Sequence, residues 1–380
     1  MSEPSLRMRG SSREPRLWSP GLLLVVSVLF LGALVPNVFV LAPRFLGDLG
    51  YDKRDIGVVM GSFNVASLAC SPLVGWMAAR FGHARVLATG CALCALGAVG
   101  FSLAGDLAGY AVARGVQGAS FAAVLVGAAA YVAETAPAGR LGEALGISGV
   151  LTLTAQAVGP AVASAIHAHA GWPWVWRLGA VSGGLGAVVA LGLPAVAARD
   201  ARDDGPRGPA AAALAATVLA GVGFGSIWTF LADYGPKVGV PDVTPFFVAY
   251  VAAAVSTRLL LGRLSDRIGR RAAATPALCG HAVILVVMAG LGATWHLVVI
   301  GLVYGLCHGV YYPTLQALIV ERSGGRRSRA IAASTFAFGA GTVIAAFGLG
   351  PVARAFDYPV IYLVAAAAGA VAAALIARGE

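Results

Sequence analysis

A few polar side chains that can do chemistry lie inside long apolar stretches of this sequence. Arg114 and Gln117 fall within 108–132, and His308 falls within 297–319. A cation in such surroundings can bind an anion or assist a proton transfer, and a histidine can exchange a proton near neutral pH. A structural role is also open for both: Arg114 can bond to backbone carbonyls or extend towards water, and His308 can be a hydrogen-bonded packing residue.

Carboxylates and catalytic sets are missing from the same stretches. Glu134 and Asp233 lie near the ends of apolar stretches, where Glu134 is expected to pair with loop arginines. No H-E-x-x-H, G-x-S-x-G or P-loop motif occurs, and His167 and His169 have no nearby carboxylate. The sequence therefore predicts neither an enzyme nor an ATP-driven pump, and no cofactor or metal is expected.

The apolar stretches that position these side chains are long enough to cross a membrane. Of the 380 residues, 58% are hydrophobic and 12% charged, whereas soluble domains carry about 25% charged residues. A spanning helix needs roughly 20 mostly apolar residues. Twelve stretches meet this requirement: 20–43, 56–79, 85–104, 108–132, 144–166, 174–196, 210–232, 244–262, 273–292, 297–319, 331–352 and 358–377. The predicted fold class is an all-α membrane protein with twelve transmembrane helices in a lipid bilayer.

The basic residues predict the orientation of these helices. With the N-terminus inside, 19 of the 27 Lys and Arg fall in segments on the inner side and 6 on the outer side. This bias follows the positive-inside rule, so both termini are expected in the cytoplasm of a multi-pass protein of the cell (inner) membrane. The net charge of +10 is thus explained by topology, and no nucleic-acid partner is expected.

Four segments follow from this division. Residues 1–18 form a polar cytoplasmic tail, and 19–196 form a first six-helix bundle with a retained first helix. Residues 197–209 are rich in charge, Pro and Gly, which predicts a cytoplasmic linker rather than a helix. Residues 210–380 form a second six-helix bundle.

Two related turns, 187 residues apart, indicate an internal duplication. The sequence GWMAARFGHAR begins at residue 75, and GRLSDRIGRR begins at residue 262. Gly118 falls opposite Gly305 in the same register, and Glu134 opposite Glu321. A duplicated membrane bundle with basic turns between helix pairs explains this pattern. The arginines of each turn either anchor the topology or take part in a gate.

Both turns resemble the G-x-L-x-D-R-x-G-R-R signature of the major facilitator superfamily of transporters. The resemblance covers the whole chain and implies two pseudo-symmetric six-helix bundles. It implies a gating motif formed by Gly75, Arg80, Gly82, Arg85, Gly262, Asp266, Arg267, Gly269, Arg270 and Arg271. The first copy has Ala79 at the acidic position, so the two gates are expected to be unequal.

Further motifs of the same family follow in order. Arg114, Gln117 and Gly118 resemble the R-x-x-Q-G motif, which the family associates with proton coupling or substrate charge. Gly146, Gly159 and Pro160 resemble a helix-five pattern of exporters, although other glycines of that pattern are replaced. The degraded copy tilts the expectation towards export. Its small residues are expected to keep helix packing close.

The resemblance also singles out the residues expected to face a central cavity, because helices one, four, seven and ten line it in this family. The candidates for substrate or coupling are Asn37, Arg114, Gln117, Trp228, Thr229, Tyr304, His308, Tyr311 and Tyr312. Aromatic and hydrogen-bonding groups around an apolar cavity suit a small amphipathic solute. Each of these residues also has a simpler explanation in packing.

The expected function is secondary active transport of a small organic solute by alternating access, with export preferred. Protons are the coupling ion that the resemblance implies, and a monomer is expected. Uptake on the same fold is the alternative, and a non-transporting membrane sensor is a further one.

Overall fold

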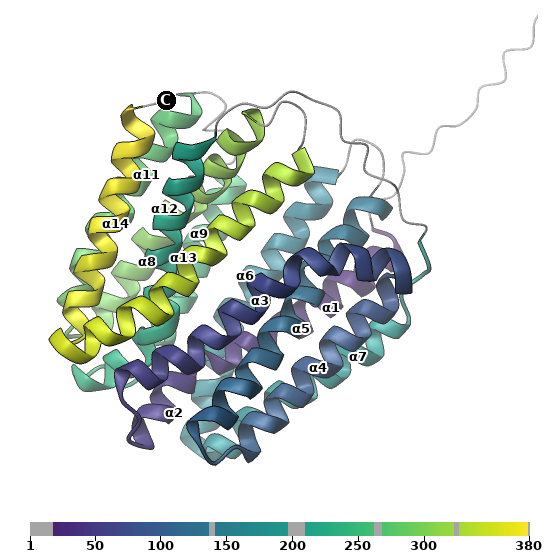
Figure 1. Cartoon of the computed structure of the whole chain (residues 1–380), viewed down its shortest axis with the longest axis horizontal. Helices are drawn as coiled ribbons and strands as arrows, with labels where there is room; N and C mark the ends of the chain where they lie inside the picture. Colours follow the sequence, from purple (N-terminus) through teal and green to yellow (C-terminus); the bar gives the residue numbers. More distant parts are fainter. Residues whose placement is uncertain (1–17, 137–140, 197–209, 262–267, 323–326, 379–380) are drawn as a thin grey trace, which may run out of the picture.

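Every regular element in the described part of the chain is a helix (Figure 1). The computed structural model describes residues 18–136, 141–196, 210–261, 268–322 and 327–378. In chain order the α-helices are α1 (Pro20–Val38), α2 (Ala42–Asp48), α3 (Lys53–Phe81), α4 (His83–Leu103), α5 (Leu107–Thr135), α6 (Leu141–Ala170), α7 (Trp172–Leu191), α8 (Ala211–Lys237), α9 (Thr244–Leu261), α11 (Arg270–Ala289), α12 (Thr294–Glu321), α13 (Arg327–Phe356) and α14 (Tyr358–Arg378).

Each of the twelve predicted stretches coincides with a helix, but the first one is not continuous. The prediction of one helix over 20–43 was wrong at its end, because α1 stops at Val38 and a 3-10 turn, Phe39–Leu41, leads into α2. Pro43 explains the break: it has no N–H to donate to the Phe39 carbonyl, and its ring crowds that oxygen.

Local sequence sets the helix ends. Ser19 caps α1 by accepting a hydrogen bond from the Leu22 N–H at 3.1 Å. Asp52 and Asp106 cap α3 and α5 in the same manner. The two related turns contain Gly82 with φ 84° and Gly269 with φ 93°, a left-handed conformation that glycine adopts without strain.

The helices fall into a first group, α1–α7, and a second group, α8–α14 (Figure 1). Within the first group α3 packs on α5 and α4 on α7; within the second, α9 packs on α12 and α11 on α14. Small residues permit this packing. A Cβ at Gly118 would meet the Phe63 carbonyl, and one at Gly305 would meet the Tyr250 carbonyl. Gly305 follows Gly118 by 187 residues, and Tyr250 follows Phe63 by the same number. The register read from the sequence therefore has a structural counterpart.

The outer surface of the bundle suits lipid. Eleven described helical segments are long and apolar enough to span a membrane, and large apolar side chains such as Leu96, Leu103 and Val188 are exposed on them. We call the end of the bundle that holds the C-terminal end of α14 the proximal face, and the opposite end the distal face. The two groups meet mainly through α3 with α13 and through α6 with α9.

Candidate functional site

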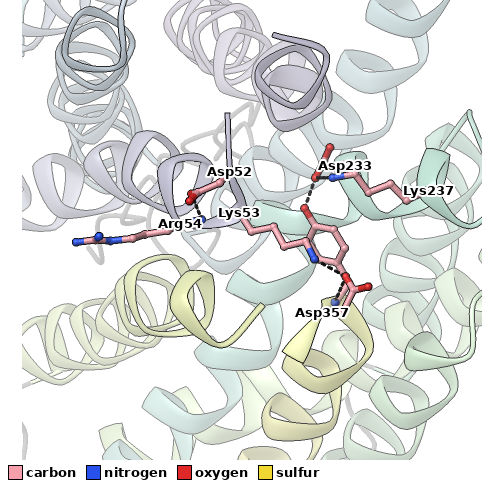
Figure 2. Close-up of polar contacts among 7 residues, drawn as sticks. Asp52, Lys53, Arg54, Asp233, Lys237 and Asp357 are labelled. Atoms are coloured by element: carbon pink, nitrogen blue, oxygen red, sulfur yellow. Dashed lines mark hydrogen bonds and ion pairs between the residues drawn. The ribbon is translucent and has the colours of Figure 1, made fainter. Parts of the chain in front are cut away.

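Charged residues join the two groups at the distal ends of α3, α13 and α14 (Figure 2). Lys53 Nζ lies 2.5 Å from Asp357 Oδ1 (Figure 2). Arg354 Nε lies 3.2 Å from Asp52 Oδ2. Both pairs connect the first helix group to the second. Opening this side of the distal face would break them.

Asp233 is the buried carboxylate of this cluster, and sequence reasoning placed it only near a helix end. The residue is 4% exposed, accepts a hydrogen bond from the Tyr358 hydroxyl, and pairs with Lys237 at 2.5 Å (Figure 2). A Cβ at Gly47 of α2 would touch its Oδ1, so the first group closes over it. The spacing of four residues between Asp233 and Lys237 was the available signal for such a pair.

A second set of contacts joins the groups at the distal ends of α2, α6 and α9. Arg44 donates to the Pro241 carbonyl at 2.9 Å, and Ser164 donates to Asp242 at 3.1 Å. The Thr244 hydroxyl lies 3.4 Å from the carbonyl oxygen of Pro160. We call both sets together, on the two sides of the distal face, the distal closure.

The Lys53–Asp357 pair predicts how this closure depends on pH. Hydrogen bonds from Lys53 and from the Tyr358 N–H lower the pKa of Asp357 below its ordinary value of 3.8. The ionised form is therefore favoured in the closed face. Its stabilisation is complete above pH 3.8 and is lost as pH falls through the lowered pKa.

We therefore expect Asp357→Asn to weaken the distal closure at pH 7, while the contribution of the Lys53–Asp357 pair in the wild-type protein does not change between pH 5 and pH 8. The Asp357 side chain is 67% exposed, so the effect should be about 0.5 kcal/mol and should shrink in high salt. A distance measurement across the distal face in low and high salt checks this. An equal effect at both salt concentrations would contradict the assignment to an ion pair.

Arg114 and Gln117 form a buried polar pair in α5. Arg114 is 3% exposed, and its Nη1 donates to Gln117 Oε1 at 2.5 Å. The guanidinium lies over the rings of Phe63 at 4.5 Å and Phe39 at 5.5 Å. No described residue accepts a hydrogen bond from Arg114 Nε or Gln117 Nε2. The backbone-bonded and water-facing alternatives for Arg114 are therefore not what this structure contains.

Three of the predicted residues lie together in the second group. Trp228, His308 and Tyr312 belong to an aromatic cluster, which we define as Phe224, Trp228, Tyr250, His308, Tyr312 and Phe338. Trp228 stacks on Phe224 with ring centroids 3.9 Å apart, and the Tyr250 hydroxyl lies 2.9 Å from His308 Nδ1. The sequence analysis missed Phe224, Tyr250 and Phe338, because aromatic residues in apolar helices carry no separate signal.

Two of the remaining second-group candidates, Tyr304 and Tyr311, also contact the cluster. The ring centroids of Tyr304 and Tyr250 are 5.7 Å apart, and those of Tyr311 and His308 are 5.3 Å apart. Tyr304 and Tyr311 are fully buried and pack against His281 of α11, with ring centroids about 5 Å away. Thr229 is 1% exposed. These surroundings indicate packing within the second group rather than a solute-facing position.

Gly146, Gly159 and Pro160, the residues of the predicted exporter pattern, lie in α6 and differ in how closely they pack. A Cβ at Gly159 would lie 2.6 Å from the Asn37 Cβ, so α1 and α6 are in close contact there. Asn37 is buried and donates to the Ala33 carbonyl at 2.7 Å. Gly146 is exposed and has open space beside it, so the expectation of close packing was wrong at that position. Pro160 contacts the second group through its carbonyl oxygen.

The gating motif is described only in part. Gly262, Asp266 and Arg267 lie outside the described residues, and the burial of Gly75 is not described either. Arg80, Arg85 and Arg271 are exposed on the proximal face.

A duplicated polar contact to a glutamate lies beside the two turns. His83 Nε2 is 2.9 Å from Glu134 Oε2, and Arg270 Nε is 2.5 Å from Glu321 Oε1. Glu134 was expected to pair with loop arginines; its described partner is instead the buried His83 at the start of α4, and Arg140 of the following loop lies outside the described residues. The two pairs share the 187-residue register, but only the first depends on a histidine.

Comparisons with known proteins agree with this architecture. The family model described as Major Facilitator Superfamily matches residues 22–237 and 213–379. The chain is 28% identical over 253 residues to the tetracenomycin C resistance and export protein of Streptomyces glaucescens, which covers 66% of this chain and 44% of that protein. It is 27% identical over 146 residues to the multidrug export protein EmrB of Haemophilus influenzae, which covers 38% and 28% of the two proteins.

These matches span less than half the length of either relative. Among solved structures, the nucleoside transporter NupG is similar with a TM-score of 0.78 at 13% identity, covering 94% of this chain and 100% of that one. At this identity the likeness concerns the fold alone. The family match extends over nearly the whole chain, and this protein belongs to the major facilitator superfamily of membrane transporters.

Proposed function

We propose that this protein exports a small organic solute across the cell membrane by alternating access. Membership of a transporter family supports transport, and the export named for two relatives supports the direction. The distal closure is the observation that carries alternating access. Among the described residues, the hydrogen bonds and ion pairs between the two helix groups lie at the distal face, where rigid groups can separate by breaking a few surface contacts.

In this proposal the two helix groups are the two halves of the transporter. The first half is 19–196 and the second 210–380, with the tail 1–18 and the linker 197–209 in the cytoplasm. The distal face is then the outer face, and the structure is the outward-closed state. The Arg114–Gln117 pair and the aromatic cluster lie in helices between the faces, where a solute reached from alternate sides would bind.

Protons are proposed as the coupling ion and a monomer as the working unit. Among the described residues, Asp233 is the buried carboxylate available to carry a proton, and it lies under the distal closure.

Uptake is the second candidate, since the fold is shared with a nucleoside transporter and fold does not set direction. A membrane sensor would bind a solute without moving it. Direction and movement are separable by experiment.

The test is a solute screen with the purified protein in sealed vesicles, with and without an imposed pH gradient. We expect one class of organic solute to accumulate in vesicles that present the proximal face outwards, and to stop accumulating when the gradient is collapsed. Protein-free vesicles are the control for leakage. Accumulation only from the distal side would indicate uptake, and binding without accumulation would indicate a sensor.

A further inference from the structure

The aromatic cluster presents flat apolar surfaces that the second group does not cover completely. Phe224, Trp228, Tyr312 and Phe338 each remain partly exposed. Phe338 lies 5.2 Å from Phe224 and 5.0 Å from Tyr312 between ring centroids. A group of stacked and edge-on rings from α8, α12 and α13 is a surface on which another aromatic ring packs well.

Unpartnered hydrogen-bonding atoms lie beside these rings. His308 is 5% exposed, and no described residue bonds to its Nε2. In the tautomer in which the Tyr250 hydroxyl donates to Nδ1, the ring proton is on Nε2, and that atom is then a donor without an acceptor. A buried donor left unpaired is destabilising, and a bound acceptor would remove that cost.

Arg258 brings a positive charge to the same place. It lies near enough to Tyr250, His308 and Tyr312 for its charge to act on each of them. Its buried Nε has no partner among the described residues. Its Nη1 is 3.6 Å from the position of a Cβ at Gly149 in α6, so the guanidinium reaches the boundary between the two helix groups.

No described carboxylate neutralises this charge. Arg258 forms no ion pair with a described Asp or Glu. Within the described ranges, unpaired hydrogen-bonding atoms and a cation therefore lie beside aromatic faces, with no carboxylate paired to that cation. A cationic solute would be repelled here, whereas an oxyanion would be bound.

We propose that the solute is an aromatic organic anion, whose ring packs on Phe224, Trp228, Tyr312 and Phe338 and whose carboxylate or similar oxyanion is bound by Arg258 and His308. This assignment of substrate class rests on the proposed transport function. It places the bound charge at the α6–α9 boundary, where it contacts both groups. Solute binding would then affect the relative movement of the two helix groups, because the bound anion contacts both of them.

Calorimetric titration of the purified full chain with three matched probes tests the charge requirement. The probes are naphthoate, the neutral naphthamide and the cationic naphthylmethylamine. We expect naphthoate to bind at least tenfold more tightly than the other two. Equal or tighter binding of the amine or the amide, or no binding of naphthoate, would overturn the proposal.

Variants locate the interaction. Arg258→Gln should weaken naphthoate binding at least tenfold and leave naphthamide binding unchanged. Arg177→Gln, which removes an exposed arginine of α7, should change neither. Naphthoate binding that is unaffected by Arg258→Gln contradicts the site. If binding depends on Arg258 but vesicles accumulate no solute, the transport proposal fails and the anion site stands. If the vesicles accumulate a cation instead, the transport proposal stands and the anion site fails.

Discussion

Gly118→Ala is expected to destabilise the folded protein strongly, whereas Gly115→Ala on the same helix is not. A Cβ at Gly118 would lie 2.7 Å from the Phe63 carbonyl carbon and 2.8 Å from its Cα. These are backbone atoms that cannot rotate away, so α3 and α5 would have to separate. Small residues at such helix contacts are what allow close packing in a membrane. We expect a loss of about 3 kcal/mol, the upper part of the range for overpacking.

The comparison is read from the thermal unfolding of both variants in detergent. Gly115 has only the Ser62 carbonyl oxygen at 4.0 Å, so an alanine fits there. Gly305→Ala should behave like Gly118→Ala, because a Cβ there would meet the Tyr250 carbonyl in the second group. Equal unfolding temperatures for Gly115→Ala and Gly118→Ala would show that the described α3–α5 contact is wrong.

Gly57→Val is expected to shift the protein away from the distal-closed state without unfolding either helix group. A Cβ at Gly57 of α3 would collide with the carbonyl oxygen of Ala346 in α13 and lie 3.5 Å from the Gly350 Cα. This contact joins the two groups rather than two helices of one group. The groups can therefore relieve the collision by moving apart at the distal face. We expect the ratio of closed to open protein to fall at least tenfold, which corresponds to about 1.4 kcal/mol.

Gly184→Val is the matched control for this variant. Gly184 lies in α7 with open space beside it, so the substitution carries the same cost of a β-branched residue in a helix but no collision. The measurement is the distance between spin labels at Leu49 and Phe356, both exposed at the distal face. A closed distance retained in Gly57→Val would mean that α3 and α13 do not set the closure.

The helices were predictable because apolar length is a local property of the sequence, whereas the packing of α3 on α5 and of α4 on α7 was not predicted. The 187-residue register even matched a contact, Gly118 with Phe63 and Gly305 with Tyr250. The break before Pro43 was missed because the apolar stretch continues through it. Whether a proline within an apolar stretch interrupts the helix cannot be predicted until the position of the helix end is known.

Only the polar residues inside apolar helices could be predicted as members of the candidate site. Arg114, Gln117 and His308 are conspicuous because they interrupt apolar helices. The distal closure joins residues as far apart in sequence as Lys53 and Asp357, and each of them alone reads as an ordinary loop charge. Such pairings depend on how the two helix groups pack against each other, which a local sequence pattern does not predict.

The two groups are also less alike than their shared register suggests. The rings of Phe63 and Phe121 lie 5.9 Å apart, and 187 residues later the same places hold Tyr250 and His308. An apolar pair in the first group thus corresponds to a hydrogen-bonded pair in the second. The unevenness first seen between Ala79 and Asp266 extends to the interior, where it puts the aromatic cluster and Arg258 in one group.

The central claim, that the two groups alternate in closing the two faces, is tested most directly by measuring both faces in one variant. A second pair of spin labels at Phe81 and Ile268, exposed at the proximal face, accompanies the Leu49 and Phe356 pair. In Gly57→Val, relative to wild type and Gly184→Val, the distal distance should lengthen while the proximal distance shortens. Distal lengthening with an unchanged or longer proximal distance would contradict alternating access.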